Sequence, residues 1–379
     1  MKTLILSCNT GEGHNSCAKA IKEYYDMRGE VCDIIDALSF ISEGWSRFIS
    51  GGHVLIYRHF PWLFKVAYRH FEEKNTYFEE GKLLYRLFAR GSERLYEYIR
   101  DGGYDAVICP HVFTALMLTD MLKKHTISLA TCFIATDYTC SPSGRNSNLD
   151  YYFIPDEEIA PDFECENITR EKMIFATIPV RQMFYQNHDK NEAKRYIGVN
   201  PGHKHLLIMC GSMGCGPLKK MLKMLSEKMP TNWEISLICG NNSGLFAELG
   251  RKYSGNERIH IWGFVKDMGI MMDSADLYLT KPGGISVSEA YAKSLPMVFI
   301  NAVGGCEESN RAIFVQRGYA ETKESIGELV DNCLYVMQDD KRRLEMKKRL
   351  SEREKQNSSE IVYNKMKELF NYKRGYGND

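Results

Sequence analysis

The sequence has no pair of cysteines spaced as C-x-x-C, although it contains 12 cysteines, so it lacks a common spacing of zinc and redox sites. We expect neither a signal peptide nor a membrane-spanning segment, because the sequence contains no apolar run long enough to cross a bilayer. Its 49 basic and 49 acidic residues cancel, so the overall charge gives no support for nucleic-acid binding. These absences favour a cytosolic protein with reduced thiols, in which any attraction to a membrane comes from a local patch.

The length of 379 residues is about twice that of a typical domain, which predicts two domains. Both halves repeat one plan, in which an apolar strand leads through a glycine-rich turn into a helix. We expect a first domain over residues 1–185, a linker with one short helix over 186–204 and a second domain over 205–338. The charged helical tail over residues 339–379 is expected to pack back on the first domain.

The stretch of residues 276–310 has the pattern of a parallel βαβ unit. Two short apolar runs are separated by a helix, and Gly283 and Gly284 stand where the first strand ends and the helix begins. Free backbone N–H groups and the helix dipole favour a phosphate at such a place, and glycine lets it approach closely. The alternative is that the two glycines form only a tight turn.

Polar side chains follow these glycines at positions that suit a nucleotide. Glu289 lies about one turn into the helix, where its carboxylate can accept hydrogen bonds from a ribose. Glu307 and Asn310 follow the next strand, at the carboxyl edge where open α/β sheets bind ligands. The combination favours a phosphate and ribose site over a plain turn.

The motifs T-K-P-G-G-I-S-V-S-E-A and G-G-C-E-E-S-N resemble the nucleotide-sugar site of glycosyltransferase family 28. That family includes monogalactosyldiacylglycerol synthases, processive diacylglycerol glucosyltransferases and the N-acetylglucosaminyltransferase of lipid II synthesis, and the likeness is greatest to the diacylglycerol branch. The resemblance implies an α/β protein of GT-B architecture, with two doubly wound Rossmann-like domains facing across a cleft. It places the UDP-sugar donor in the C-terminal domain and a lipid acceptor in the N-terminal domain.

The resemblance also implies a set of donor contacts. A second glycine-rich turn, residues 211–217, corresponds to the loop that approaches the donor phosphates. Phe264 and Val265 match the position that brackets the uracil ring, although Phe264 is equally compatible with a core position. Cys306 replaces the more usual Gln of the family, so both glucose and galactose remain open. The expected donor-binding residues are Gly211, Ser212, Met213, Gly214, Phe264, Val265, Lys281, Gly283, Gly284, Ile285, Glu289, Glu307 and Asn310.

Two residues of the N-terminal half are candidates for the catalytic base. The segment Gly11-Glu12-Gly13-His14 resembles the G-G-H loop of the family, which faces the acceptor. Asp137 follows a predicted strand at the ligand edge, where the family has a candidate general base. The alternatives are that His14 caps a helix and that Asp137 is an N-cap or turn residue. We take Asp137 as the base and His14 as the residue that positions the acceptor.

Aromatic and basic residues alternate between residues 41 and 95, which is typical of a helix lying in the interface of a membrane. The alternative is a helix with aromatic residues in the core and basic residues in solvent. The resemblance favours the membrane, because lipid-acceptor members of the family dock through this region. We therefore expect a peripheral protein on the cytoplasmic face of the cell membrane. The expected acceptor or membrane contacts are Gly11, Gly13, Trp45, Tyr57, Arg58, Trp62, Lys65 and Arg69.

The resemblance implies an inverting transfer of a hexose from a UDP-sugar to diacylglycerol. No metal or other cofactor is expected, because the sequence has no D-x-D pair and the helix after Gly284 can stabilise the leaving diphosphate. Three alternatives stay open: a transferase acting on a polyprenyl-linked sugar, a UDP-sugar 2-epimerase, and a non-catalytic lipid- or nucleotide-binding module. No nucleic-acid partner is expected.

Overall fold

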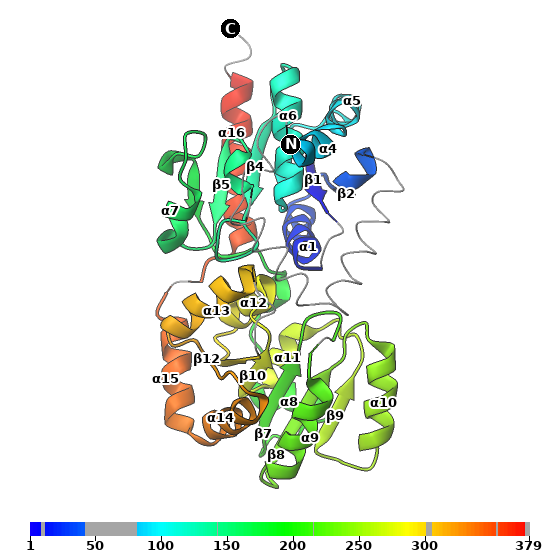
Figure 1. Cartoon of the computed structure of the whole chain (residues 1–379), viewed down its shortest axis with the longest axis vertical. Coiled ribbons are helices and arrows are strands. Elements are labelled where there is room, and N and C mark those ends of the chain that lie inside the picture. The colour runs from blue at the N-terminus through cyan, green and yellow to red at the C-terminus, as the bar shows by residue number, and fades with distance from the viewer. Residues whose placement is uncertain are drawn as a thin grey trace. The chain divides into compact units, whose positions relative to one another are not determined.

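The computed structural model describes residues 1–8, 12–41, 82–141, 143–214, 216–300, 305–353 and 355–375. The chain divides into two compact units (Figure 1). Unit 1 comprises Met1–Gln182, Val303–Cys306 and Gln356–Asp379, and unit 2 comprises Met183–Ala302 and Glu307–Lys355. The aromatic and basic segment from Trp45 to Arg69 and the glycine Gly11 lie outside the described residues.

Unit 1 is built on a six-stranded sheet in the order β2-β1-β3-β4-β5-β6, and every neighbouring pair is parallel. The three central strands β1, β3 and β4 are apolar runs in which every residue is buried, as expected for a sheet covered on both faces, whereas the edge strands β2 and β6 are only partly buried. They are β1 (Thr3–Ser7), β2 (Cys32–Asp36), β3 (Ala106–Cys109), β4 (Ala130–Ile134), β5 (Tyr151–Ile154) and β6 (Met173–Phe175). The helices are α1 (Glu12–Met27), α4 (Leu83–Ala89), α5 (Ser92–Gly102), α6 (Val112–Lys124), α7 (Ala160–Phe163) and α16 (Ser358–Gly375).

The last helix, α16, packs on α1 and β4 of unit 1. Its Tyr363 hydroxyl donates to Glu30 Oε1 at 3.1 Å, and the Lys367 ammonium contacts the same oxygen at 2.9 Å. The hydrogen bonds from Lys367 and from the N-terminal ammonium lower the pKa of Glu30 to about 2. The preceding helix α15 (Asp340–Ser351) belongs to unit 2, so the tail expected over residues 339–379 is divided between the units.

Unit 2 contains a second six-stranded parallel sheet, in the order β12-β11-β10-β7-β8-β9. A core cluster lies on one face of this sheet, where Leu206 and Ile208 of β7 and Leu277 and Leu279 of β10 are buried. The strands are β7 (Lys204–Met209), β8 (Trp233–Ile238), β9 (Ile259–Trp262), β10 (Leu277–Thr280), β11 (Met297–Phe299) and β12 (Ala320–Thr322). Besides α15, the helices are α8 (Lys190–Tyr196), α9 (Leu218–Lys228), α10 (Ser243–Tyr253), α11 (Met268–Ser274), α12 (Gly284–Ala292), α13 (Cys306–Gln316) and α14 (Ile326–Gln338).

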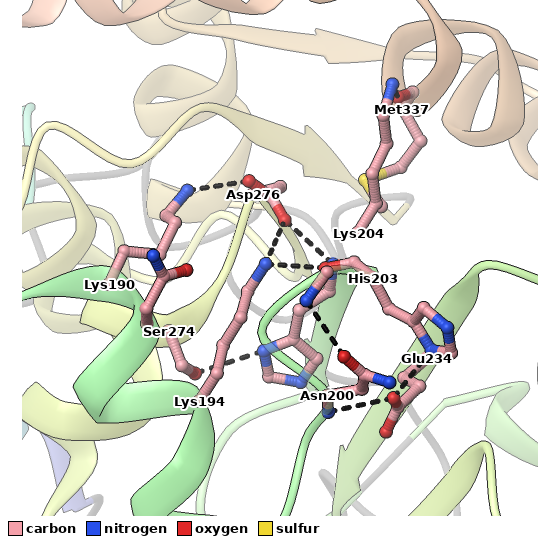
Figure 2. Close-up of polar contacts among 12 residues, drawn as sticks. Lys190, Lys194, Asn200, His203, Lys204, Glu234, Ser274, Asp276 and Met337 are labelled. Carbon is pink, nitrogen blue, oxygen red and sulfur yellow. Dashed lines mark hydrogen bonds and ion pairs between the residues drawn. The ribbon is translucent and has the colours of Figure 1, made fainter.

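Helix α8 lies in the segment 186–204 that the sequence analysis treats as a linker. Figure 2 shows Lys190 and Lys194 reaching from α8 to Asp276, directly before β10, at 2.6 and 3.3 Å. The backbone N–H of His205 donates to the same carboxylate at 2.8 Å. Burial opposes ionisation of Asp276, but these partners keep the pKa of its carboxyl below the usual value. This network fixes α8 to the amino end of the sheet, which places the segment in unit 2.

The two doubly wound parallel sheets confirm the predicted fold class. Ligands of such parallel sheets bind at the edge where the strands end and helices begin.

Candidate active site

The turn between β10 and α12 forms the centre of the candidate donor site in unit 2. Gly283 occupies the N-cap of α12 in an extended conformation (φ −77°, ψ 137°), and Gly284 is buried at the first helical position. Because glycine has no side chain to cap the helix, the first backbone N–H groups of α12 suit an anion. This is the arrangement that the Gly-Gly pair predicts.

Two residues of α13 meet this turn. Lys281 Nζ lies 2.7 Å from Glu307 Oε1, and the two side chains are only 23% and 12% exposed. Asn310 is fully buried and donates from Nδ2 to the Pro282 carbonyl oxygen at 3.0 Å. The Asn310 side chain therefore supports the turn by binding the backbone carbonyl of Pro282. Lys281 and Glu307 bring opposite charges to the edge of the turn.

The side chains expected from α12 itself are Ile285, in its first turn, and Glu289, in its second. Both are half-buried. Their place beside the helix N-terminus agrees with the spacing read from the sequence, although the nucleotide contacts assigned to them stay predictions.

The second glycine-rich turn lies beside the first, because β7 and β10 are neighbours in the sheet. Gly211 and Gly214 both have positive φ values, +67° and +55°, and the Gly214 N–H donates to the Gly211 carbonyl at 3.2 Å. A Cβ on Gly211 would stand 2.8 Å from Cε of Lys281, so the lysine stem runs against this glycine. Ser212 and Met213, between the glycines, are half-buried. The structure thus brings both predicted phosphate-binding turns together.

Phe264 follows β9, the strand at one edge of the same sheet. Its side chain is 67% exposed, which excludes the alternative that it is a core residue. Val265 is half-buried. An exposed aromatic ring at the carboxyl edge is compatible with the predicted contact to a nucleobase.

His14 lies in the first turn of α1 in unit 1, and its ring reaches the ends of two other strands. Nδ1 lies 2.9 Å from the Pro110 carbonyl oxygen, after β3, and 2.9 Å from Oγ1 of Thr136, after β4. A carbonyl oxygen can only accept, so Nδ1 carries the proton in the neutral ring and Nε2 is the basic nitrogen. These contacts lie outside α1, so they do not fit the alternative that the ring merely caps this helix.

Asp137 follows Thr136 directly and is half-buried, so the two candidate bases occupy the same edge of the sheet. Gly13 is exposed at the start of α1. The other expected acceptor and membrane residues, Gly11, Trp45, Tyr57, Arg58, Trp62, Lys65 and Arg69, lie outside the described residues.

His111 is a neighbour of His14 that the sequence analysis does not single out. Its ring packs edge-on against that of His14, with centroids 4.4 Å apart and an interplanar angle of 69°. His111 is 7% exposed and caps α6, since its Nδ1 accepts the Phe113 N–H at 3.1 Å. The only signal in the sequence for this helix cap is a histidine that stands between a predicted strand and an apolar helix.

In the part of the chain that the structure describes, no three His, Cys, Asp or Glu side chains gather in a way that could hold a metal ion. The described helices include none with the length and apolar content of a membrane span. Eight of the described cysteines are buried and three are half-buried, all as free thiols. Burial raises the pKa of Cys109 and of Cys333 to about 12.

Each unit matches a known protein family. Residues 14–180 match the model of monogalactosyldiacylglycerol (MGDG) synthase, and residues 211–356 match the model of glycosyl transferases group 1. A processive diacylglycerol beta-glucosyltransferase of Bacillus cytotoxicus is 24% identical over 368 residues, covering 91% of this chain and 88% of that protein. The protein of the same name from Bacillus licheniformis is 23% identical over 377 residues, covering 95% and 92%.

Solved structures share the fold. MurG of Acinetobacter baumannii superposes with a TM-score of 0.65 at 11% identity, covering 97% of this chain and all of the other. MnaA of Staphylococcus aureus gives a TM-score of 0.61 at 14% identity, covering 98% and 97%. These likenesses confirm the predicted GT-B fold. The family matches in the two units, together with relatives at 23–24% identity that span nine-tenths of the chain, show that this chain is similar to the monogalactosyldiacylglycerol synthases and the processive diacylglycerol glucosyltransferases.

Proposed function

We propose that this protein transfers a hexose from a UDP-sugar to the free hydroxyl of diacylglycerol, giving a β-glycosyl diacylglycerol. The observation that carries the proposal is the match of residues 14–180 to the MGDG synthase model, because this half is expected to bind the acceptor. Relatives named processive diacylglycerol beta-glucosyltransferase support the same acceptor and the β linkage.

The donor binds at the carboxyl edge of the unit 2 sheet in this proposal. Its diphosphate meets the N-terminus of α12 and the ammonium of Lys281, both of which favour negative charge. Glu289 accepts hydrogen bonds from the ribose, and Glu307 accepts them from the hexose. The backbone of Val265 contacts the uracil.

The chemistry is a single displacement with inversion. The acceptor oxygen forms a bond to the anomeric carbon while the bond from that carbon to the diphosphate oxygen breaks. The hydroxyl proton passes to a base, and UDP leaves with the electron pair. The helix N-terminus and Lys281 stabilise the charge that develops on the leaving oxygen, so the proposed reaction needs no metal ion. Activity that survives EDTA would support this point, and activity restored only by a divalent cation would remove it.

The geometry of unit 1 favours His14 as the base, in contrast to the sequence-based choice of Asp137. The bond from Nδ1 to Pro110 leaves Nε2 of the neutral ring as the proton acceptor, and an unperturbed histidine titrates near neutral pH. Asp137 brings a negative charge to the same edge, and such a charge favours the imidazolium that forms. We therefore assign proton removal to His14 and stabilisation of the charged ring to Asp137.

We further propose that the protein binds the cytoplasmic face of the membrane through the segment that contains Arg58, Lys65 and Arg69. The protein should sediment together with vesicles that contain anionic lipid. At high salt it should stay in the supernatant, because salt screens exposed ion pairs. Replacing these three residues by Glu should abolish sedimentation. The matched control replaces Lys341, Lys347 and Lys348, exposed on α15, and should leave it unchanged. Equal loss in both variants would remove the segment from the proposal.

The test of the function is mass spectrometry of lipids after incubation with UDP-glucose or UDP-galactose. The protein is mixed with vesicles that contain diacylglycerol and anionic lipid. The proposal predicts hexosyl diacylglycerol with at least one of the two donors. Glycolipid formed only when a polyprenyl-linked sugar is supplied would identify a different acceptor. Binding of UDP without any product would identify a non-catalytic module.

A further inference from the structure

Two turns at the carboxyl edge of the unit 2 sheet are joined through their backbones. One is the β7–α9 loop, which begins after Met209 and contains Gly211 to Gly214. The other is the β8–α10 turn, residues 239–242. The Asn241 N–H donates to the Ser212 carbonyl oxygen at 2.7 Å, and Asn242 Nδ2 donates to the Gly214 carbonyl at 3.4 Å. The second turn therefore engages two carbonyl groups of the first.

A glycine on each side allows this approach. Gly240 has φ +58°, and a Cβ there would stand 2.1 Å from the Ser212 carbonyl oxygen. Gly214 has φ +55°, and a Cβ there would stand 2.4 Å from the Cys239 carbonyl oxygen. Both contacts are to backbone atoms, so no side-chain rotation can relieve them. The two turns fit only because each places a glycine against a carbonyl of the other.

The β8–α10 turn is itself held from two sides. The Cys239 N–H donates to the Trp262 carbonyl of the neighbouring strand β9 at 2.8 Å. Asn242 caps α10, because its Oδ1 accepts the Leu245 N–H at 3.0 Å. This turn is thus anchored to the sheet and to a helix, and it can impose its position on the β7–α9 loop.

The consequence reaches a backbone group of the expected donor site. A peptide bond is planar and trans, so the Ser212 carbonyl and the Met213 N–H point in opposite directions. When Asn241 fixes the Ser212 carbonyl, it also fixes the direction of the Met213 N–H. On the far side of the loop, Gly211 packs against the stem of Lys281, so a shift of the loop would also reach that lysine.

We propose that the β8–α10 turn is a positioning element of the UDP-sugar site, with Gly240 as its key residue. Gly240 acts through the β7–α9 loop: it lets the turn hold the Ser212 carbonyl, and the loop then presents its N–H groups to the diphosphate. This inference rests on the proposed donor site in unit 2. It adds to that site a residue that lies outside the donor contacts expected from the sequence.

The test compares Gly240→Ala with Gly198→Ala. Gly198 lies in the same unit, has φ +77° and has no atom within 4 Å of an added Cβ, so it shares the backbone penalty without the contact. We expect Gly240→Ala to weaken UDP binding at least tenfold by calorimetry and to speed hydrogen–deuterium exchange in the β7–α9 loop. Gly198→Ala should change neither property. In turnover assays, Gly240→Ala should raise KM for the UDP-sugar more than it lowers kcat.

A second variant, Asn242→Asp, keeps the positioning role testable if Gly240→Ala does not fold. Aspartate retains an oxygen to cap α10 but lacks the amide that donates to Gly214. We expect weaker UDP binding at an unchanged Tm, whereas unchanged UDP binding would overturn the positioning role. Gly240→Ala that folds and binds UDP as tightly as Gly198→Ala would overturn it too. Wild-type protein that binds no UDP would instead overturn the donor site, and this inference with it.

Discussion

The ammonium of Lys281 lies 2.7 Å from the carboxylate of Glu307, so the residue that follows β10 is bound to the first turn of α13. Both side chains are mostly buried, so solvent and salt screen this pair less than an ordinary surface ion pair. In the proposed complex the donor inserts between them: the lysine turns to the diphosphate and the glutamate to the hexose. The ion pair would then keep both groups in place while the site is empty.

The proposed contact between Glu307 and the hexose predicts that a substitution of Glu307 weakens binding of the UDP-hexose more than binding of UDP. Glu307→Gln should raise KM for the UDP-hexose about five- to tenfold, because a neutral acceptor binds hydroxyl groups less strongly than a carboxylate. UDP lacks the hexose, so its Kd should change by less than about threefold. Glu308→Gln, the next residue of α13, is the control and should change neither constant. An equal loss of UDP affinity in Glu307→Gln would show that Glu307 acts on the nucleotide instead.

Glu289 is predicted to hold the ribose. Glu289→Ala should weaken UDP binding by roughly 1.5–3 kcal/mol, the usual cost of a lost hydrogen bond to a charged group. Calorimetry with UDP measures the effect. The control is Glu248→Ala on α10, where the carboxylate is half-exposed and pairs with Lys219. A folded Glu289→Ala variant with wild-type affinity for UDP would remove Glu289 from the site.

The assignment of the base predicts unequal effects of two substitutions. His14→Ala should lower kcat at saturating donor by on the order of 10²-fold or more, the scale of general-base catalysis, with UDP binding unchanged. Asp137→Asn should lower kcat less, because Asp137 only stabilises the charged ring. A severe loss in Asp137→Asn beside near-normal His14→Ala would restore the sequence-based choice of Asp137.

His205 in β7 predicts a pH dependence of the stability of unit 2. The side chain is fully buried, with Nδ1 3.0 Å from Oγ of Ser274, and burial lowers its pKa to about 4. An unfolded histidine titrates near 6.5, so below that pH the unfolded chain binds a proton that the folded chain excludes. Stability should therefore fall as the pH drops from about 6.5 to 4 and then level off.

The measurement is urea unfolding followed by tryptophan fluorescence at several pH values, with His205→Gln as the comparison. The variant should lack the wild-type loss of up to about 1.4 kcal/mol per pH unit in that range. Identical pH dependence in both proteins would mean that other groups, such as the buried Glu234 with its partners His203 and His260, control the acid sensitivity.

The sequence predicts the fold well because buried parallel strands are short apolar runs, as in residues 204–209 and 277–280. The Gly283-Gly284 turn can be predicted from the sequence equally well, since two glycines after such a strand indicate a strand–helix turn. The sequence also predicts the one short helix within residues 186–203, which is α8, but it assigns that helix to a linker and not to unit 2. This helix is short and polar, and its main anchor is Asp276, far along the chain.

Contacts of the candidate site were harder to predict than its residues. The pairing of Lys281 with Glu307 and the packing of Gly240 on Ser212 depend on which strands are neighbours. Local periodicity gives the strands but not their order. The tautomer of His14 likewise depends on Pro110 and Thr136, which come from two other strands.

The most direct test of the central claim follows UDP release from UDP-glucose or UDP-galactose in vesicles with and without diacylglycerol. The account predicts that, with the donor that the protein uses, UDP forms only when diacylglycerol is present. It should form in an amount equal to the hexose recovered in the lipid fraction. The account is contradicted if UDP forms at the same rate without diacylglycerol. It is also contradicted if the UDP-sugar is converted to an isomer with no UDP released, as a 2-epimerase would do.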